Sequence, residues 1–272
     1  MGEFLRKWVS KRLAALSARD IVLLMAHTRQ LGVGTSGGAE ALAIFHQLVY
    51  DMWAAGQLPQ GLARVKIDEK NCFGMLSWGA IREAAKEHLP RHHAVTCWKH
   101  KVKSVAQQHD VQDTEKDRGA EQGDVDGPIE CALAMAVIAA EARGTVHKDQ
   151  AAGRLPWSIR EATRLTGDGV HQAIRDNENR QARATAWRNR RPADRRQRQA
   201  DGGITPSPVH EIQANGGLAD FWYLDDGDVM CDPRLVVPFL SAFDKANTRA
   251  GAVRNQEKTE VIYYATQGQL QA

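Results

Sequence analysis

The chain has 272 residues and a formal net charge of +3, with 36 lysines and arginines against 33 aspartates and glutamates. This length can hold one large domain or two small ones. Four widely spaced cysteines argue against a disulfide framework and predict free thiols in a reducing compartment. The longest apolar run, residues 131–142, is too short to cross a bilayer, and charged residues interrupt the apolar N-terminus, which argues against a signal peptide. We therefore expect an intracellular protein, nuclear or cytoplasmic, that is neither secreted nor bound to a membrane.

Two helices are expected near the N-terminus, with a glycine-rich stretch between them. Apolar residues recur at helical spacing from Phe4 to Leu16, with basic residues on the other face, as in an amphipathic helix. Residues 30–37 contain a literal G-x-G-x-x-G, which on its own could suggest a dinucleotide site. Such a site also needs an acid at the end of a second strand, whereas Asp51 lies in a helical pattern. We expect a glycine-rich loop before a helix that begins near Glu40.

A short strand over residues 62–67 is expected to end at Asp68, and Phe73 follows it closely. Beyond them, Ser77 can cap a helix whose apolar stripe ends near Pro90. Residues 88–100 then include four histidines and one cysteine. Cys-x-x-His is half of a zinc site, but no second pair stands at the standard spacing. Solvated loop histidines are therefore expected there.

Residues 119–128 have the pattern of a glycine-rich loop that leads into a helix, with Pro128 at a favourable first helical position. Glycines let backbone amides approach a ligand closely. The side-chain amide of Gln122 can both donate and accept hydrogen bonds. This loop is a candidate for contact with a nucleotide or a template.

The apolar periodicity fades from about residue 147 to residue 215. Between Arg160 and Arg198, eleven arginines stand against five acids. Such a basic stretch can bind nucleic acid through its phosphates, and the alternative is a solvated, partly disordered insertion. The candidate contacts to nucleic acid are Arg188, Arg190, Arg191, Arg195 and Arg196.

Residues 218–230 predict a β-hairpin, because an apolar run meets an Asp-Gly pair and is followed by further apolar residues. Asp225 and Asp226 are therefore expected on the turn, which is an ordinary place for Asp and Gly. Two adjacent carboxylates repel each other and are commonly neutralised by cations, for which hard divalent ions such as Mg²⁺ are suited. Since Asp68 also stands at a strand end, a shared metal site is the alternative to a simple surface turn.

Four segments in this order resemble the motifs of a reverse transcriptase palm, most closely those of non-LTR retrotransposons. The segments are residues 68–73 (an acid followed by an aromatic residue), 119–128 (the glycine-rich loop), 223–226 (Tyr-Leu-Asp-Asp) and 251–260 (a glycine, then Asn-Gln-Glu-Lys-Thr-Glu). The resemblance covers roughly residues 30–264, apart from the arginine-rich stretch. The second segment departs from the family pattern, in which proline and an apolar residue are common at the positions of Val125 and Asp126.

The resemblance implies an α/β palm, with an antiparallel sheet that carries the acids and helices packed on one face. It implies RNA-directed DNA polymerisation, with an RNA template, a DNA primer and dNTPs as partners and Mg²⁺ or Mn²⁺ as cofactor. Asp68, Asp225 and Asp226 would bind the metal ions. Lys258 would complete the catalytic group by supplying positive charge or a proton near the leaving pyrophosphate. Contacts to the nucleotide are implied for Glu69, Phe73, Gln122 and Gly123.

The resemblance also divides the chain and leaves two rival functions. The implied parts are residual fingers and helices leading to the palm (1–60), a first palm segment (61–146), the arginine-rich insertion (147–215) and a second palm segment (216–272). We expect an incomplete polymerase domain of a retroelement, without the thumb. One rival is an RNA-dependent RNA polymerase, which normally carries a polar residue where Phe73 stands. The other is a non-catalytic remnant of a retroelement that binds nucleic acid.

Overall fold

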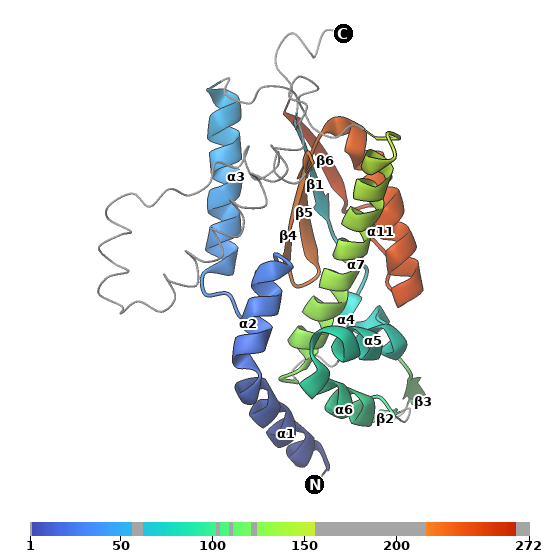
Figure 1. Cartoon of the computed structure of the whole chain (residues 1–272). Coiled ribbons are helices and arrows are strands. Elements are labelled where there is room, and N and C mark those ends of the chain that lie inside the picture. The colour runs from blue at the N-terminus through green and yellow to red at the C-terminus, as the bar shows by residue number, and fades with distance from the viewer. Residues whose placement is uncertain are drawn as a thin grey trace, which may run out of the picture.

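The computed structural model of the chain describes residues 2–55, 62–101, 104–108, 111–120, 124–155 and 216–264. A four-stranded antiparallel sheet, in the order β4-β5-β1-β6, lies at its centre (Figure 1). Its strands are β1 (Leu62–Ile67), β4 (Leu218–Tyr223), β5 (Asp226–Cys231) and β6 (Glu260–Tyr264). A separate hairpin pairs β2 (Ser104–Gln108) with β3 (Val111–Lys116). The predicted α/β fold with an antiparallel sheet is confirmed.

Two long helices that pack side by side cover one face of the sheet (Figure 1). They are α7 (Gly127–Ala151) and α11 (Val236–Ala250), the latter preceded by the short helix η1 (Pro233–Leu235). Because side chains alternate along a strand, Val65 of β1 and Val229 of β5 point to the same face and join the core under these helices. Trp222 of β4 is fully buried there and stacks on Phe243 of α11, with ring centroids 5.3 Å apart.

Three shorter helices follow β1, namely α4 (Cys72–Met75), α5 (Trp78–His88) and α6 (Pro90–Lys99). Ser77 caps α5 as predicted, since its hydroxyl oxygen accepts a hydrogen bond from the Ala80 amide at 3.1 Å. The expectation of solvated loop histidines after α5 is wrong. That stretch is helical, and both His92 and His100 are buried; His100 Nε2 lies 3.2 Å from Glu130 Oε2 of α7. A buried histidine is tolerated where a charged group partners it.

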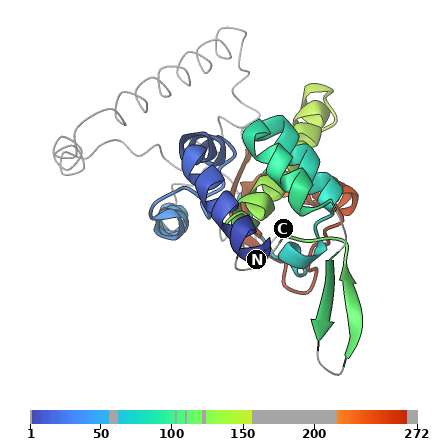
Figure 2. The same ribbon diagram turned by 90° about the horizontal axis from the view of Figure 1, so that it is seen from below.

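Helix α3 (Gly38–Ala54) covers part of the opposite face of the sheet. Leu62 and Met230 point to this face and pack with Val49 of α3. Figure 2 shows α3 nearly end-on, apart from α5 and α6. The expectation of helices on one face alone is therefore incomplete. Near the tip of the β4–β5 hairpin this face remains open, since Tyr223 is 38% exposed.

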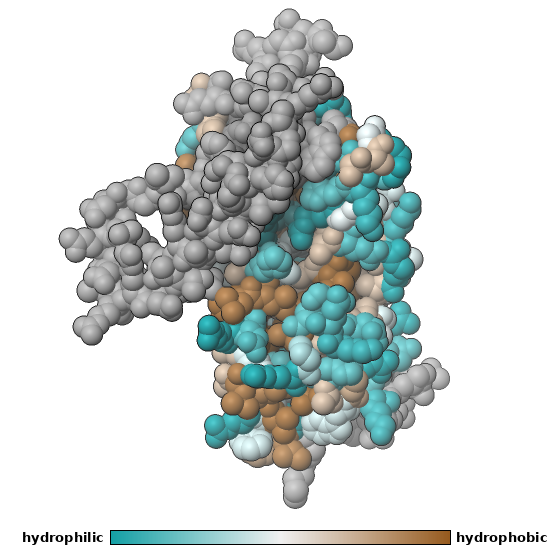
Figure 3. Space-filling model, in the orientation of Figure 1, coloured by the Kyte–Doolittle hydropathy of each residue, from teal (hydrophilic) through white to brown (hydrophobic). Residues whose placement is uncertain are grey.

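The N-terminal residues form α1 (Gly2–Leu16) and α2 (Ala18–His27). Helix α2 buries Ile21 and Met25 in a cluster that also contains Ile129 and Leu133 of α7. The predicted amphipathic helix is present as α1, and Figure 3 shows apolar surface over these two helices. The large apolar side chains exposed along them are Phe4, Leu5, Trp8, Leu16 and Leu23.

The expectations on cysteines and on membrane segments can be compared directly with the structure. The four cysteines are free thiols, and those of Cys72 and Cys131 lie 3.4 Å apart in the main core. No helix in the described part of the chain is long and apolar enough to cross a membrane.

The packing around Trp222 yields a first prediction. A methyl group added to Gly227 would lie 2.5 Å from Trp222 Cζ3, so the ring would have to move. We expect Gly227→Ala to lower the free energy of unfolding by about 1–3 kcal/mol, measured by urea denaturation. The control is Gly144→Ala in α7, where an added methyl group meets nothing within 4 Å. This substitution should raise stability by roughly 0.5–1 kcal/mol. Equal effects of the two substitutions would contradict the packing described.

Candidate functional site

The pairing of β1 with β5 brings three acids to one end of the sheet. The two strands run antiparallel, with Ile67 opposite Gly227. Continuing this register by one residue places Asp68 beside Asp226. Asp225 precedes Asp226 on the turn between β4 and β5, where Tyr223 pairs with Asp226. Acids that are far apart in the sequence therefore share one corner of the sheet.

The turn lies one step earlier than the Asp-Gly pair had suggested. Its two central residues are Leu224 and Asp225, whereas Asp226 and Gly227 already belong to β5. The glycine is required by the Trp222 ring beside it and not by the turn. Leu224 takes up the left-handed conformation instead, with φ of +59°. Such a conformation is uncommon for a residue other than glycine.

The carboxylates of this site influence one another electrostatically. Burial raises the pKa of Asp225 above its ordinary value, and the charge of Asp68 raises it further. Burial, followed by the charges of Asp225 and Asp68, also raises the pKa of Asp226, and Lys258 and Lys66 oppose this shift. The three acids are thus close enough to repel one another. Additional positive charge at this point would relieve that repulsion.

Asp68 is held by the loop that follows α11. Asn255 donates a side-chain hydrogen bond to Asp68 Oδ2 at 2.9 Å, and its backbone amide donates to the Asp68 carbonyl at 2.7 Å. Lys258 Nζ lies 3.7 Å from the same Oδ2 atom. Lys258 therefore lies beside the acids. The resemblance of residues 251–260 to the fourth motif had implied this position.

The donor set fits a hard divalent cation by its chemistry, since carboxylate oxygens are the preferred ligands of Mg²⁺. Within the described ranges, however, no three acidic, histidine or cysteine side chains stand in a group that could hold a metal ion without rearrangement. One oxygen of Asp68 is already engaged by Asn255 and Lys258. Binding of a cation by all three acids would require these side chains to turn toward a common point.

Glu69 lies apart from these acids, on the helix side of the sheet. It is 5% exposed, and Oε1 accepts a hydrogen bond from Asn247 Nδ2 of α11 at 2.7 Å. Burial raises the pKa of Glu69 to about 7, helped by Asp244 and Asp225, while Asn247 and Arg254 oppose the rise. Glu69 lies beyond the end of β1, in an isolated bridge with Arg254, and its predicted contact with a nucleotide stays a prediction.

The remaining predicted site residues divide into two groups. Phe73 lies on α4, partly buried against the main core, and its predicted contact with a nucleotide stays a prediction. The loop residues Gln122 and Gly123 lie outside the described residues. The same holds for the five candidate arginines, Arg188, Arg190, Arg191, Arg195 and Arg196.

Two residues near the acids were missed by the sequence analysis. Lys66 stands two positions before Asp68, and Asn255 holds the Asp68 carboxylate directly. The two-residue repeat of a strand would have placed Lys66 on the face of Asp68. Asn255 belongs to the fourth motif, but its contact with Asp68 spans most of the chain, so no local pattern assigns it that role.

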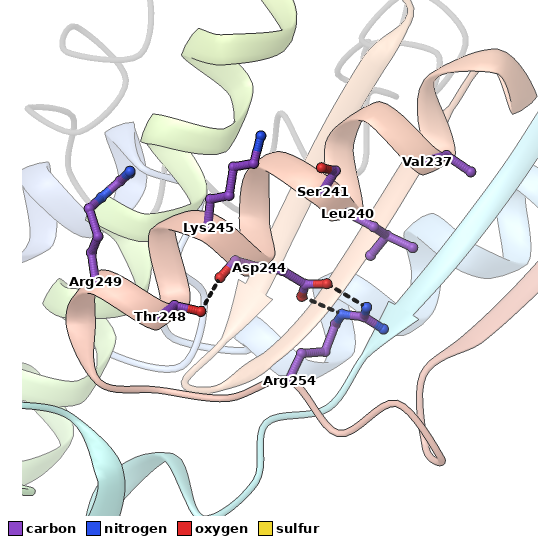
Figure 4. A pocket seen from close by; sticks show the side chains of 8 residues that line it. All are labelled: Val237, Leu240, Ser241, Asp244, Lys245, Thr248, Arg249 and Arg254. Carbon is purple, nitrogen blue, oxygen red and sulfur yellow. Dashed lines mark hydrogen bonds and ion pairs between the residues drawn. The ribbon is translucent and has the colours of Figure 1, made fainter.

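A hollow of about 690 Å³ lies along α11, away from the three acids (Figure 4). Arg254 crosses it and donates two hydrogen bonds to the carboxylate of Asp244, each 2.7 Å long. None of the acids at the sheet corner contributes to its wall. Its lining residues are Val237, Leu240, Ser241, Asp244, Lys245, Thr248, Arg249 and Arg254.

Comparisons with known proteins leave the family open. No family model matches this sequence, and no curated protein matches it either. Among solved structures, apo telomerase from Candida tropicalis, truncated from its C-terminal domain, is similar with a TM-score of 0.49 and 13% identity over 93% of this chain and 40% of that chain. Telomerase from Candida albicans, bound to a TWJ fragment of telomeric RNA, gives a TM-score of 0.45 and 12% identity over 96% of this chain and 35% of that one. The chain thus spans two fifths or less of these telomerase chains. A likeness at this level carries no conclusion on function, which has to be inferred from the acids and their surroundings.

The raised pKa of Glu69 predicts a specific pH dependence of stability. Because the pKa rises from 4.5 to about 7 on folding, the folded chain holds this proton more tightly than the unfolded chain. Stability from this group is therefore present below about pH 4.5 and is lost as the pH rises through 7. We expect Glu69→Gln to match the wild type near pH 4.5 and to exceed it by up to about 3 kcal/mol near pH 8.

Urea denaturation across this pH range measures the difference. Glu257→Gln, at an exposed position of the loop after α11, serves as the control and should change stability little at any pH. A wild-type advantage that grows above pH 7 would show that the buried carboxylate is held ionised.

Proposed function

We propose that the chain carries the nucleotidyl-transfer site of an RNA-directed DNA polymerase, the reverse transcriptase domain of a retroelement. The observation that carries this proposal is the meeting of Asp68 with Asp225 and Asp226 at one end of the sheet. A solvated Asp-Asp-Gly turn needs no acid from a second strand. Two-metal phosphoryl transfer, in contrast, needs carboxylates brought together from separate strands.

In this proposal Asp68, Asp225 and Asp226 hold Mg²⁺ or Mn²⁺. Bound divalent ions would activate the primer 3′ hydroxyl and neutralise the charge of the triphosphate. Burial raises the pKa values of Asp225 and Asp226 most, and the charges of the neighbouring acids raise them further; a bound cation would relieve this second contribution. Because the carboxylates bind a metal ion in their ionised form, metal binding is expected to release protons from them.

The chain's own cations have separate tasks. Lys258, beside Asp68, would place positive charge or a proton near the leaving pyrophosphate. Lys66, on the neighbouring strand β1, lowers the pKa of Asp226 and so favours its ionised form. Phe73, a short distance after Asp68, would lie under the nucleotide sugar and exclude a 2′ hydroxyl by its volume. Gln122 and Gly123 would contact the nucleotide.

The partners proposed are an RNA template, a DNA primer and dNTPs. The sheet face that carries the acids is open at the hairpin tip and covered by α3 farther along, so a template and primer would lie across the open end. The arginines 188, 190, 191, 195 and 196 would add contacts to phosphates, which depend strongly on salt. In the alternative function, the chain would bind nucleic acid at the same open end of the sheet without catalysing a reaction.

Binding of Mn²⁺ tests the site independently of polymerase activity. We expect the wild-type chain to bind Mn²⁺, measured by the loss of its free EPR signal, and Asp226→Asn to weaken the affinity by roughly tenfold or more. Glu260→Gln removes an exposed acid of the neighbouring strand β6 and should leave the affinity unchanged. Equal weakening by both substitutions would reduce the site to unspecific surface charge.

Sugar selection tests the choice of a DNA polymerase over an RNA polymerase. In a primer-extension assay, Phe73→Val should raise ribonucleotide incorporation relative to deoxynucleotide incorporation by roughly tenfold, because it removes a steric barrier. Phe45→Val is a matched control, since Phe45 is partly buried in the separate cluster under α3. It should lower both activities alike, if at all. Equal loss of both activities in Phe73→Val would assign Phe73 to the core, and absence of extension in the wild type would favour the non-catalytic alternative.

A further inference from the structure

The side chain of Gln30 is bonded to the tip of the β4–β5 hairpin. Gln30 is fully buried, and its Nε2 donates a hydrogen bond to the Leu224 carbonyl at 2.9 Å. Its Oε1 accepts hydrogen bonds from the Leu224 amide at 2.7 Å and from the Gly32 amide at 3.1 Å. One side chain thus satisfies both backbone polar groups of Leu224, as a neighbouring strand would.

Leu224 is the residue of the tip that most needs such support. Its φ of +59° lies in the left-handed region. For a residue with a side chain this conformation is unfavourable and persists only where the surroundings fix it. Because Leu224 is followed directly by Asp225 and Asp226, its backbone conformation sets the direction in which both acids leave the turn.

The segment that carries Gln30 is itself bound along β4. The Trp222 amide donates to the Arg29 carbonyl at 3.0 Å, and the Leu31 amide donates to the Trp222 carbonyl at 2.6 Å. These two bonds form a parallel bridge between Gln30 and Trp222. The backbone of Gln30 is therefore fixed to the same hairpin that its side chain grips.

Close packing explains Gly32, the first glycine of the G-x-G-x-x-G stretch, and Gly38, which directly follows the stretch. A Cβ atom at Gly32 would lie 2.6 Å from the Leu224 amide nitrogen, and one at Gly38 would lie 2.1 Å from the Leu31 carbonyl oxygen. A side chain at Gly32 would push the segment away from the hairpin, and one at Gly38 would disturb the backbone of Leu31 within the segment. The glycines thus serve the approach of one backbone to another and not the approach of a backbone to a nucleotide phosphate.

We propose that Gln30 is a positioning residue, which holds Leu224 in its left-handed conformation and thereby holds Asp225 and Asp226 where they bind divalent cations. This role rests on the proposed function, since it presumes that these acids bind cations. The side chain of Gln30 bonds to the backbone of Leu224 and Gly32 and acts on the acids through Leu224. Partners that orient metal ligands from outside the coordination sphere commonly contribute tenfold to a hundredfold in metal affinity.

The test compares two buried glutamines that bond to the same hairpin. Gln30 holds its tip, whereas Gln150 of α7, also buried, donates to the Gly216 carbonyl at 2.7 Å just before β4 begins. Gln30→Met and Gln150→Met each remove a buried amide and keep the length of the side chain. Both should lose stability, so only a readout local to the tip separates them.

Two measurements on each purified full chain give that readout. Amide hydrogen exchange followed by NMR should show the Leu224 amide exchanging at least tenfold faster in Gln30→Met, beyond any change common to the whole chain. Mn²⁺ affinity, measured by EPR, should fall by roughly tenfold in the same variant. Gln150→Met should leave both values at the wild-type level. Should Gln30→Met fail to fold, Gln30→Leu also removes both hydrogen bonds to Leu224 without adding a charge, and the same two values should shift in the same direction.

The outcomes separate this inference from the proposed function. Local loss of protection together with weaker Mn²⁺ binding in the Gln30 variants supports the positioning role. Equal effects of Gln30→Met and Gln150→Met, or loss of protection with unchanged Mn²⁺ affinity, overturn the role of Gln30 but leave the cation site in place. A wild-type chain that binds no Mn²⁺ overturns the cation site itself, and with it any role of Gln30 there.

Discussion

The antiparallel register between β1 and β5 is the constraint on which the rest of the structure depends. It places Ile67 opposite Gly227, so that Asp68, directly after β1, lies beside Asp226, the first residue of β5. A slip of one residue would turn every side chain of β1 to the other face of the sheet. It would bury Asp68 under the helices and expose Val65, which forms part of the main core. The burial of apolar side chains and the assembly of the acids are thus enforced by the same pairing.

The β4–β5 hairpin, which supplies the other two acids, is fixed along β4 by the helix layer and at its tip by Gln30. Trp222 anchors β4 beneath α11 by stacking on Phe243, and its indole nitrogen donates to Asp220 at 2.8 Å. Asp220 is fully buried and paired with Arg143 of α7, whose Nη1 lies 2.6 Å from Oδ1. Truncating one partner of such a buried pair leaves an unbalanced charge, so this pair ties β4 strongly to the helix layer. The tip beyond it depends on Gln30.

Local sequence patterns predicted several of the elements, but not α2, α6 or the β2–β3 hairpin, and not the junctions between elements. The strand before Asp68, the helix after Pro128 and the hairpin around Asp225 follow from alternation, turn residues and capping. The position of the turn was wrong because Gly227 serves the Trp222 ring, a contact that propensity alone does not reveal. His92 and His100 were misassigned because tertiary partners, such as Glu130 of α7 beside His100, decide whether a polar residue is buried. The contacts of Gln30 and Asn255 join segments from the two ends of the chain, so no short pattern predicts them.

The central claim is that acids from two strands share one divalent-cation site. The most direct measurement is anomalous X-ray scattering from crystals of the chain grown or soaked with Mn²⁺. The account predicts a Mn²⁺ peak in contact with carboxylate oxygens of both Asp68 and the Asp225–Asp226 pair, with Asp68 released from Asn255 or Lys258. A peak held by the acids of only one strand, or no peak at this corner of the sheet, would contradict it.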